Sequence, residues 1–245
     1  EPDAVLHLAG LSSVAQSLGD PDTTLRVNVL GTLNLLQALK AARFAGTLLY
    51  VSSGDVYGQV AERDLPINET HLPAPRSPYA VSKLAGESLC YQWWVTEGLR
   101  VVIARPFNHI GPGQSNRFAI AAFASQIGAI RRGERPPVVD VGDIDVTRDF
   151  TDVRDIVWAY FALLAGGTSG ERYNVCSGCE SSVRDTLERM IELAGVTAEI
   201  RQDPSRLRPA EQRRVVGDPA KIRADTGWQP TVSLDASLKA VLNAA

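Results

Sequence analysis

The chain has 245 residues, 44% of them hydrophobic and 22% charged, with a net charge of −3 at pH 7. This length is enough to bury a sizeable core, as one large domain or as a domain with a smaller lobe. The mild acidity argues against nucleic acid and membranes as partners, and no apolar run approaches the ~20 residues that a membrane helix needs. Nothing at the start has the features of a signal peptide, so a cytoplasmic location is expected.

The first part of the chain alternates short apolar runs with longer amphipathic segments. Residues 4–10, 46–53 and 99–105 are apolar and end in small or polar residues, as buried parallel strands do. Residues 22–43 carry leucines at helical spacing, and residues 77–97 begin with Ser-Pro and precede a glycine, which are start and stop signals of a helix. This alternation predicts an α/β fold with a doubly wound parallel sheet of the Rossmann type.

Small and polar residues gather where the three predicted strands end. They are Ala9-Gly10, Ser52-Ser53 and Pro106-Phe107-Asn108. Because ligands bind outside the carboxyl ends of the strands in such sheets, we expect the chemistry at this edge.

Beyond Asn108 the alternation loosens. The pattern predicts helices over 117–132 and 152–165, a helix from Ser182, and short strands near 138–141, 146–151 and 173–175. We therefore predict a Rossmann-type catalytic domain over 1–107 and 147–170, incomplete at its N-terminus. A smaller α/β substrate-binding lobe is predicted over 108–146 and 171–245.

The three cysteines do not indicate a disulfide framework, because their number is odd and their spacing is long. Cys176 and Cys179 form a C-x-x-C, which can be a redox or metal pair. A zinc site would want a second pair or nearby histidines, and the three histidines are scattered along the chain. We therefore expect no metal and interpret the pair as the end of a buried strand.

Tyr79 and Lys83 lie four residues apart in the predicted helix, so both project from one face. A phenol with a pKa near ~10 is a poor proton donor at neutral pH unless its anion is stabilised, and an ammonium one turn away does this. Ser53, at a strand tip, can add a hydrogen bond to a substrate oxygen. Together these groups can protonate a carbonyl oxygen while a hydride reaches its carbon. Taken alone, Y-x-x-x-K is equally an exposed Tyr and Lys on an ordinary helix.

Longer segments around these residues resemble the extended short-chain dehydrogenase/reductase family. They are HLAG at 7–10, NVLGTLNLL at 28–36, VSSGDVYG at 51–58, PYAVSK at 78–83, RPFNHIGPG at 105–113, RDFTDVRD at 148–155, YNVCSG at 173–178 and DPAKIRADTGW at 218–228. Because they cover nearly the whole chain in one order, the match is far more specific than a single motif. The resemblance implies an enzyme that uses NADP or NAD.

The resemblance also assigns roles to individual residues. Ser53, Tyr79 and Lys83 correspond to the catalytic residues, with Tyr79 as proton donor and Lys83 holding both the phenol and the nicotinamide ribose. Besides Tyr79 and Lys83, the residues that correspond to the family's cofactor site are Leu8, Ala9, Gly10, Asn28 and Phe107. The residues that fall where the family holds a nucleotide diphosphate and its sugars are Ser12, Asn108, Arg148, Arg208 and Glu211.

Arginines suit a diphosphate because the guanidinium donates bidentate hydrogen bonds to phosphate oxygens. The other interpretation of this stretch is a solvated basic loop, because further arginines crowd it. These are Arg201, Arg206, Arg213 and Arg214.

One family feature has no counterpart in these 245 residues. The family's Gly-rich loop brings backbone amides and a helix N-terminus to the cofactor pyrophosphate. It normally precedes the segment that corresponds to residues 4–10, whereas this chain starts at Glu1 without a methionine. We therefore expect the sequence to be a fragment of a longer protein.

Within the family, the segment 206–230 and the PFNH tetrad resemble enzymes that process GDP-mannose. Two activities compete: the 4,6-dehydratase, and the reductase that acts on its product, GDP-4-keto-6-deoxy-D-mannose. The dehydratase takes a proton from carbon 5 with a glutamate two residues after the catalytic Ser/Thr, and Asp55 stands at that position. Because its carboxylate is one methylene shorter, and a misplacement of ~1 Å can cost about a hundredfold in rate, the reductase that yields GDP-D-rhamnose is favoured.

Two alternatives stay open. Another nucleotide-sugar epimerase or dehydratase would share the catalytic residues but recycle its NAD(P)H, and a non-catalytic nucleotide-sugar-binding protein would use neither. The family usually forms a homodimer by packing two helices of each copy into a four-helix bundle. Leu30, Ala80 and Leu84 are apolar or small residues that would permit this contact.

Overall fold

The apolar runs near the start of the chain form a parallel sheet. In this computed structural model, which describes residues 2–206 and 212–245, the sheet has the order β1-β2-β3-β7. Its strands are β1 (Ala4–His7), β2 (Thr47–Val51), β3 (Arg100–Pro106) and β7 (Arg172–Val175). All neighbouring pairs are parallel, with Leu49 opposite Val102 and Ala104 opposite Tyr173. The predicted parallel α/β sheet is confirmed.

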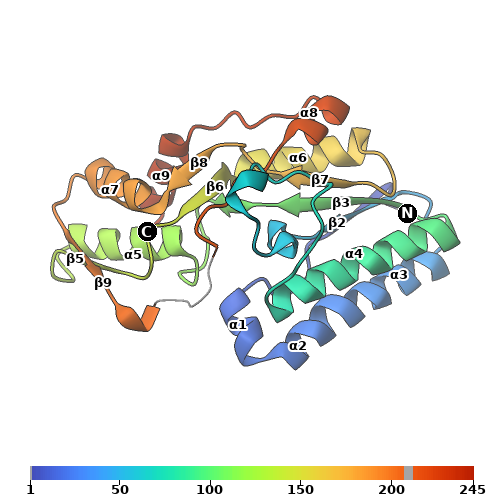
Figure 1. Cartoon of the computed structure of the whole chain (residues 1–245), viewed down its shortest axis with the longest axis horizontal. Helices are drawn as coiled ribbons and strands as arrows, with labels where there is room; N and C mark the ends of the chain where they lie inside the picture. The colour runs from blue at the N-terminus through green and yellow to red at the C-terminus, as the bar shows by residue number, and fades with distance from the viewer. Residues whose placement is uncertain (1, 207–211) are drawn as a thin grey trace. The chain divides into compact units, whose positions relative to one another are not determined.

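Helices cover this sheet, and Figure 1 shows α3 and α4 side by side along one face. The helices of this part are α1 (Val14–Gly19), α2 (Pro21–Leu25), the π-helical turn η1 (Arg26–Leu30), α3 (Gly31–Ala41), α4 (Pro78–Glu97), α6 (Val153–Gly166) and α8 (Ala220–Thr226). Leu36, Tyr50, Trp93 and Ile103 belong to one core cluster, so α3 and α4 pack on β2 and β3. Burial of such apolar side chains stabilises the arrangement by about 1.5–3 kcal/mol each.

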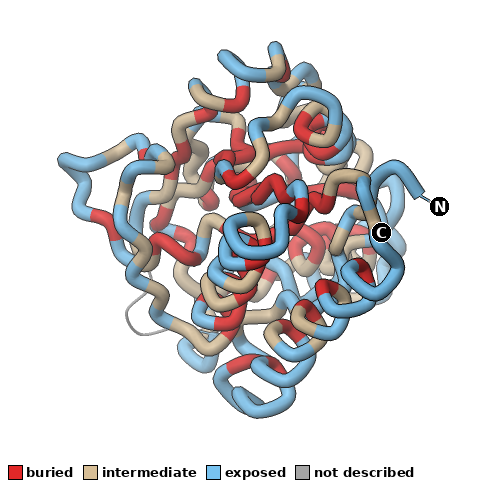
Figure 2. Tube along the Cα trace, turned by 90° about the vertical axis from the view of Figure 1, so that its right-hand side faces the viewer, coloured by how far each residue is buried: buried red, intermediate tan, exposed pale blue. Residues whose placement is uncertain are grey.

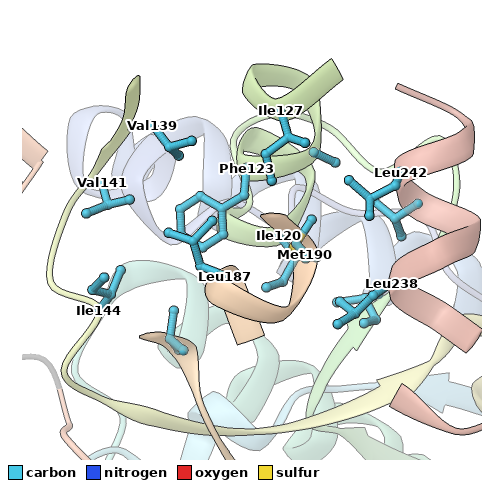
Figure 3. Packing of buried hydrophobic residues seen from close by; sticks show 14 of the residues in the cluster. Ile120, Phe123, Ile127, Val139, Val141, Ile144, Leu187, Met190, Leu238 and Leu242 are labelled. Carbon is cyan, nitrogen blue, oxygen red and sulfur yellow. The ribbon is translucent and has the colours of Figure 1, made fainter. Parts of the chain in front are cut away.

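The remaining elements form smaller sheets. One has the order β4-β6-β8 and another pairs β5 with β9. Their strands are β4 (Asn108–Ile110), β5 (Val138–Val141), β6 (Thr147–Asp152), β8 (Glu180–Ser182) and β9 (Glu199–Gln202). The helices are α5 (Ala119–Arg131), α7 (Val183–Ala194) and α9 (Leu234–Asn243). Figure 3 shows Phe123, Leu187 and Leu238 pointing into one apolar core from these three helices.

The chain divides into two compact units. Unit 1 comprises Glu1–Phe107, Val157–Val175 and Gly217–Gln229, and unit 2 comprises Asn108–Ile156, Cys176–Val216 and Pro230–Ala245. Buried residues are concentrated in β2, β3 and β7 and on one side of the longer helices, and Figure 2 shows buried and exposed residues along the chain. Among the described residues, no helix has the length and apolar character needed to cross a membrane.

The units differ from the predicted domain bounds at three places. Residues 147–156 lie in unit 2, because β6 pairs with β4 and β8. Residues 171–175 lie in unit 1, because β7 extends the parallel sheet beside β3. Residues 217–229 also belong to unit 1, where the Asp218 amide donates to the Ile67 carbonyl oxygen.

Candidate active site

The first two turns of α4 hold two of the predicted catalytic residues. Ser77 caps this helix by accepting a hydrogen bond from the Ala80 amide at 3.1 Å, and Pro78 occupies its first position. Tyr79 and Lys83 follow on one face, each only 7% exposed. The Lys83 Nζ lies 5.9 Å from the centroid of the Tyr79 ring.

Ser53 reaches the same place from the sheet. It lies just beyond the end of β2, is 9% exposed, and has an extended backbone. Its hydroxyl oxygen accepts a hydrogen bond from the Asp55 amide at 3.1 Å and is hydrogen-bonded to the Tyr79 side chain. The fold thus brings Ser53, Tyr79 and Lys83 together.

Burial sets the proton affinities of these groups. It raises the pKa of Tyr79 above that of a free phenol, the Asp55 charge raises it further, and the Ser53 hydrogen bond opposes both. We expected the Lys83 charge to lower this pKa, but the pKa is raised, and the effect that lowers it comes from Ser53. For Lys83, burial lowers the pKa to about 8, and the Glu87 carboxylate one turn further along α4 opposes this effect. Lys83 is therefore still charged at neutral pH.

Asn28 ties the loop after β1 to α4. It lies in η1, a π-helical turn, a local deformation that is frequent at functional sites. Its side-chain Oδ1 accepts a hydrogen bond from the Leu11 amide at 2.8 Å. Its Nδ2 donates to the Leu11 carbonyl oxygen at 3.0 Å and to the Ser82 hydroxyl at 2.9 Å. The Ser82 hydroxyl donates in turn to the Tyr79 carbonyl oxygen. Asn28 therefore helps to position the turn of α4 that carries Tyr79 and Lys83.

Three of the predicted cofactor residues lie just beyond β1, and Phe107 directly follows β3. Leu8, Ala9 and Gly10 are exposed, whereas Phe107 is buried against Gly54. A side-chain carbon added at Gly10 would lie 2.9 Å from the Asn28 Oδ1 and 3.7 Å from the Lys83 Nζ. Only glycine leaves this space beside the ammonium open.

Lys83 also has hydrogen-bonding capacity to spare. Its Nζ carries three protons and, within residues 2–206 and 212–245, donates to the Val51 carbonyl oxygen at 2.9 Å. An open backbone at Gly10 and a cation with free donors are what a ribose with its hydroxyl groups would require. The residues present therefore fit the nicotinamide ribose end of the cofactor.

The predicted substrate residues are divided between the units. Ser12 is exposed in the loop after β1, in unit 1. Asn108 begins β4, and Arg148 lies in β6 and donates to the Thr147 carbonyl oxygen at 2.7 Å, both in unit 2. Arg208 and Glu211 lie outside the described residues.

The cysteine pair takes the position that we expected. Cys176 directly follows β7 and is buried, Cys179 is exposed, and both are free thiols. Across the part of the chain that the structure describes, no group of His, Cys, Asp and Glu residues could hold a metal ion.

Two charged residues beside the catalytic turn were not predicted from the sequence. Glu87 on α4 and Arg105 in β3 are buried and form an ion pair, with 2.6 Å between Oε2 and Nη2. A signal was available in the positions of both residues. Arg105 ends the strand LRVVIAR, and Glu87 follows Lys83 by one helical turn.

Comparison with known proteins gives consistent matches over the whole chain. The model of the GDP-mannose 4,6 dehydratase family matches residues 1–241. The chain is 57% identical over 242 residues to a GDP-6-deoxy-D-mannose reductase of Pseudomonas aeruginosa, covering 99% of this chain and 80% of that protein. It is 32% identical over 240 residues to a UDP-glucose 4-epimerase of Mycolicibacterium smegmatis, and this match covers 96% of this chain and 73% of the epimerase.

Solved structures agree with these relatives. RMD from Pseudomonas aeruginosa, complexed with NADPH, superposes with a TM-score of 0.96 at 56% identity, covering 99% of this chain and 80% of that one. A UDP-glucose 4-epimerase from Thermotoga maritima, with UDP-glucose, gives a TM-score of 0.89 at 29% identity, covering 99% and 77%.

Proposed function

The chain belongs to the GDP-mannose 4,6-dehydratase family of extended short-chain dehydrogenases/reductases, and from this membership we propose its reaction. It is an NAD(P)-dependent nucleotide-sugar reductase that converts GDP-4-keto-6-deoxy-D-mannose to GDP-D-rhamnose. The observation that carries this conclusion is the 57% identity, over nearly the whole chain, to a GDP-6-deoxy-D-mannose reductase. The arrangement of Ser53, Tyr79 and Lys83 supports it, because a ketone reductase needs a proton donor and a neighbouring cation.

When bound, NADPH or NADH supplies the hydride that reaches carbon 4 of the sugar. The Tyr79 phenol gives its proton to the oxygen as negative charge develops there, and it is reprotonated from solvent. The Ser53 hydroxyl, already hydrogen-bonded to Tyr79, donates to the same oxygen. Lys83 stabilises the phenolate by its charge and holds the ribose with its spare donors.

The remaining site residues belong to the same proposal. Leu8, Ala9, Gly10, Asn28 and Phe107 line the nicotinamide end of the cofactor. A second set holds the nucleotide diphosphate and its sugars, and unit 2 acts as the substrate lobe. This set consists of Ser12, Asn108, Arg148, Arg208 and Glu211.

The dehydratase is the alternative within the family, and Asp55 argues against it. This residue occupies the place of the glutamate that takes the proton from carbon 5, and its carboxylate is one methylene shorter. The test offers GDP-4-keto-6-deoxymannose with NADPH, and separately GDP-mannose with NADP⁺, to the purified protein. Stoichiometric loss of NADPH with the keto sugar alone supports the reductase. Conversion of GDP-mannose to the keto sugar, with the cofactor recycled, contradicts it.

Reductase activity is expected to fall as the pH rises above about 8. Burial lowers the pKa of Lys83 to about 8, so the cation that stabilises the Tyr79 phenolate is present below this pH and lost above it. At pH values well above 8, on the alkaline limb of the pH profile, kcat should decrease about tenfold for each pH unit. A pH profile of kcat checks this, and a rate that stays constant up to pH 10 would contradict it.

We also propose that two copies pair through a four-helix bundle. Apolar side chains are exposed on one stripe of α4 and on η1: Val81 is 43% exposed, Tyr91 46%, Val95 59% and Leu30 51%. Ala80, which we expected on this face, is instead buried within the chain. Exposed apolar stripes of this kind mark protein–protein contacts.

The variant Val95→Glu is expected to convert the dimer to a monomer, because it places a charge in the apolar stripe. Sedimentation analysis measures the mass. Thr96→Glu is the matched control, since Thr96 is the exposed neighbour that points in another direction on α4. If Val95→Glu remains as large as the unmodified protein, the bundle is not the contact.

A cytoplasmic location completes the proposal. All three cysteines, Cys90, Cys176 and Cys179, are free thiols. Free thiols suit the reducing cytoplasm, where structural disulfides are rare.

A further inference from the structure

A buried carboxylate connects the three catalytic residues of the proposed function. Glu87 lies on α4 four residues after Lys83 and eight after Tyr79, on the same side of the helix, and is 4% exposed. Its Oε1 accepts a hydrogen bond from the Ser52 hydroxyl at 2.5 Å. Ser52 directly precedes Ser53, so one side chain joins the helix that carries Tyr79 and Lys83 to the strand tip that carries the serine.

Arg105 holds this carboxylate in place. It donates from Nε to Oε1 at 2.8 Å and from Nη2 to Oε2 at 2.6 Å, the bidentate geometry that fixes the orientation of a carboxylate. Its guanidinium also lies 4.8 Å from the centroid of the Tyr57 ring. Within the described chain, its Nη1 has no hydrogen-bond acceptor, so the pair does not satisfy all of its own polar atoms.

The close approach of α4 to the sheet makes these contacts possible. A side-chain carbon added at Gly86 would lie 2.0 Å from the Tyr50 hydroxyl, so only glycine allows the helix to lie this near β2. The Tyr50 hydroxyl donates to the Lys83 carbonyl oxygen at 3.3 Å from the same side. Glu87 and Lys83 therefore both face the buried side of the helix.

Stability alone does not account for a charged pair in this core. Replacing a buried ion pair with apolar side chains of similar volume is often neutral or stabilising. Apolar residues would fill the space between α4 and β3 without an unpaired Nη1. Packing therefore does not by itself explain the charges or the Ser52 hydrogen bond.

We propose that Glu87, held by Arg105, is a positioning residue of the reductase. Through the Ser52 hydroxyl it fixes the end of β2 that carries Ser53. It also places a negative charge one helical turn from Lys83. The inference rests on the proposed function, since it assigns Glu87 an effect on the catalytic residues and no contact with substrate. It has two separable parts, one geometric through Ser52 and one electrostatic through Lys83.

The groups around Lys83 and Glu87 allow the electrostatic part to be read from a pH profile. They are His7 from β1, Tyr50 from β2, Tyr79 and Cys90 from α4, and Arg105 from β3, with Asp55 and Tyr160 acting on Tyr79. Burial lowers the pKa of His7 and raises the pKa of Cys90 to about 12. Burial raises the pKa of Tyr50 and that of Tyr79 as well. Lys83 is then the group that titrates between pH 7 and 10, and Glu87 acts to raise its pKa.

Two variants separate the two parts. Ser52→Ala removes the hydrogen bond and no charge, so kcat is expected to fall about tenfold while the alkaline limb stays in place. In the double variant Glu87→Gln, Arg105→Met, the carboxylate charge is lost without leaving Arg105 unpaired in the core. Its alkaline limb is expected to move down by about one pH unit, with the KM for the nucleotide sugar little changed.

Asp225→Asn is the matched control. Its carboxylate accepts a hydrogen bond from the buried Tyr173 hydroxyl at 2.6 Å in the same unit, away from Lys83, and its variant should keep the limb of the unmodified protein. An NMR titration of isotope-labelled lysine side chains reads the Lys83 pKa without relying on turnover. A folded double variant with an unmoved limb and an unmoved Lys83 titration overturns the electrostatic part, and an unchanged kcat in Ser52→Ala overturns the geometric part. Failure of the proposed function is distinct: the unmodified protein would then consume no NADPH with the keto sugar.

Discussion

Replacing Tyr79 with phenylalanine is expected to lower kcat by about 10²–10⁴-fold. The substitution removes one hydroxyl group from a ring that is buried at the start of α4 and leaves the ring itself in place. That hydroxyl is the group that interacts with Ser53, and in the proposed reaction it gives its proton to the ketone oxygen. The fold should therefore survive while the proton donor is lost. Consumption of NADPH with saturating keto sugar measures the effect.

Tyr91→Phe provides the matched control for this change. Tyr91 lies on the same helix but is 46% exposed, and its ring packs against Trp94 at 5.4 Å between centroids. Its variant should retain the turnover of the unmodified protein. If Tyr79→Phe were as active as Tyr91→Phe, the phenol would not be the proton donor and the catalytic assignment would fail.

The second large effect is on stability. Arg105→Met alone should lower the free energy of unfolding by about 3–5 kcal/mol, because it leaves the Glu87 carboxylate buried without its cation. The accompanying Glu87→Gln should recover most of this loss, since no unpaired charge then remains in the core. Chemical denaturation of the single and double variants gives the two free energies.

An exposed ion pair supplies the comparison. Arg26 and Asp22 lie 3.1 Å apart with side chains 70% and 78% exposed, so Arg26→Met should change the unfolding free energy little. If Arg26→Met and Arg105→Met lowered the free energy of unfolding equally, breaking the buried pair of Arg105 and Glu87 would cost no more than breaking an exposed pair.

Local patterns were sufficient to predict the helix that bears Tyr79 and Lys83. The Ser77-Pro78 start and the Gly98 end of α4 agree with the structure, and Gly98 adopts the left-handed conformation with φ of 70°. Helical periodicity then placed Tyr79 and Lys83 on one face, because residues four apart always share a face. The tips of β1 and β2 were predictable for a similar reason, since parallel strands end at one edge.

Other features needed contacts between distant residues. The predicted helix 22–43 is divided by the π-helical turn η1, where Asn28 binds Leu11 and Ser82, and no local propensity signals such a turn. The strand β6 pairs antiparallel with β8, and residues 147–156 therefore belong to unit 2 and not to the predicted catalytic domain. Strand partners are chosen by packing between segments that are far apart in sequence, so periodicity within each strand does not reveal them.

The sequence by itself determined the family and the parallel α/β sheet, and it was enough to propose Ser53, Tyr79 and Lys83 as catalytic residues, because these depend on motifs and on spacing within single elements. Only the tertiary structure decided how the groups influence one another. Burial, which depends on neighbours from several elements, sets the pKa of Lys83 at about 8 and raises that of Tyr79. The pairing of Glu87 with Arg105 likewise exists only because α4 crosses β3 closely enough to exclude water, which is the condition that makes charge–charge interactions strong.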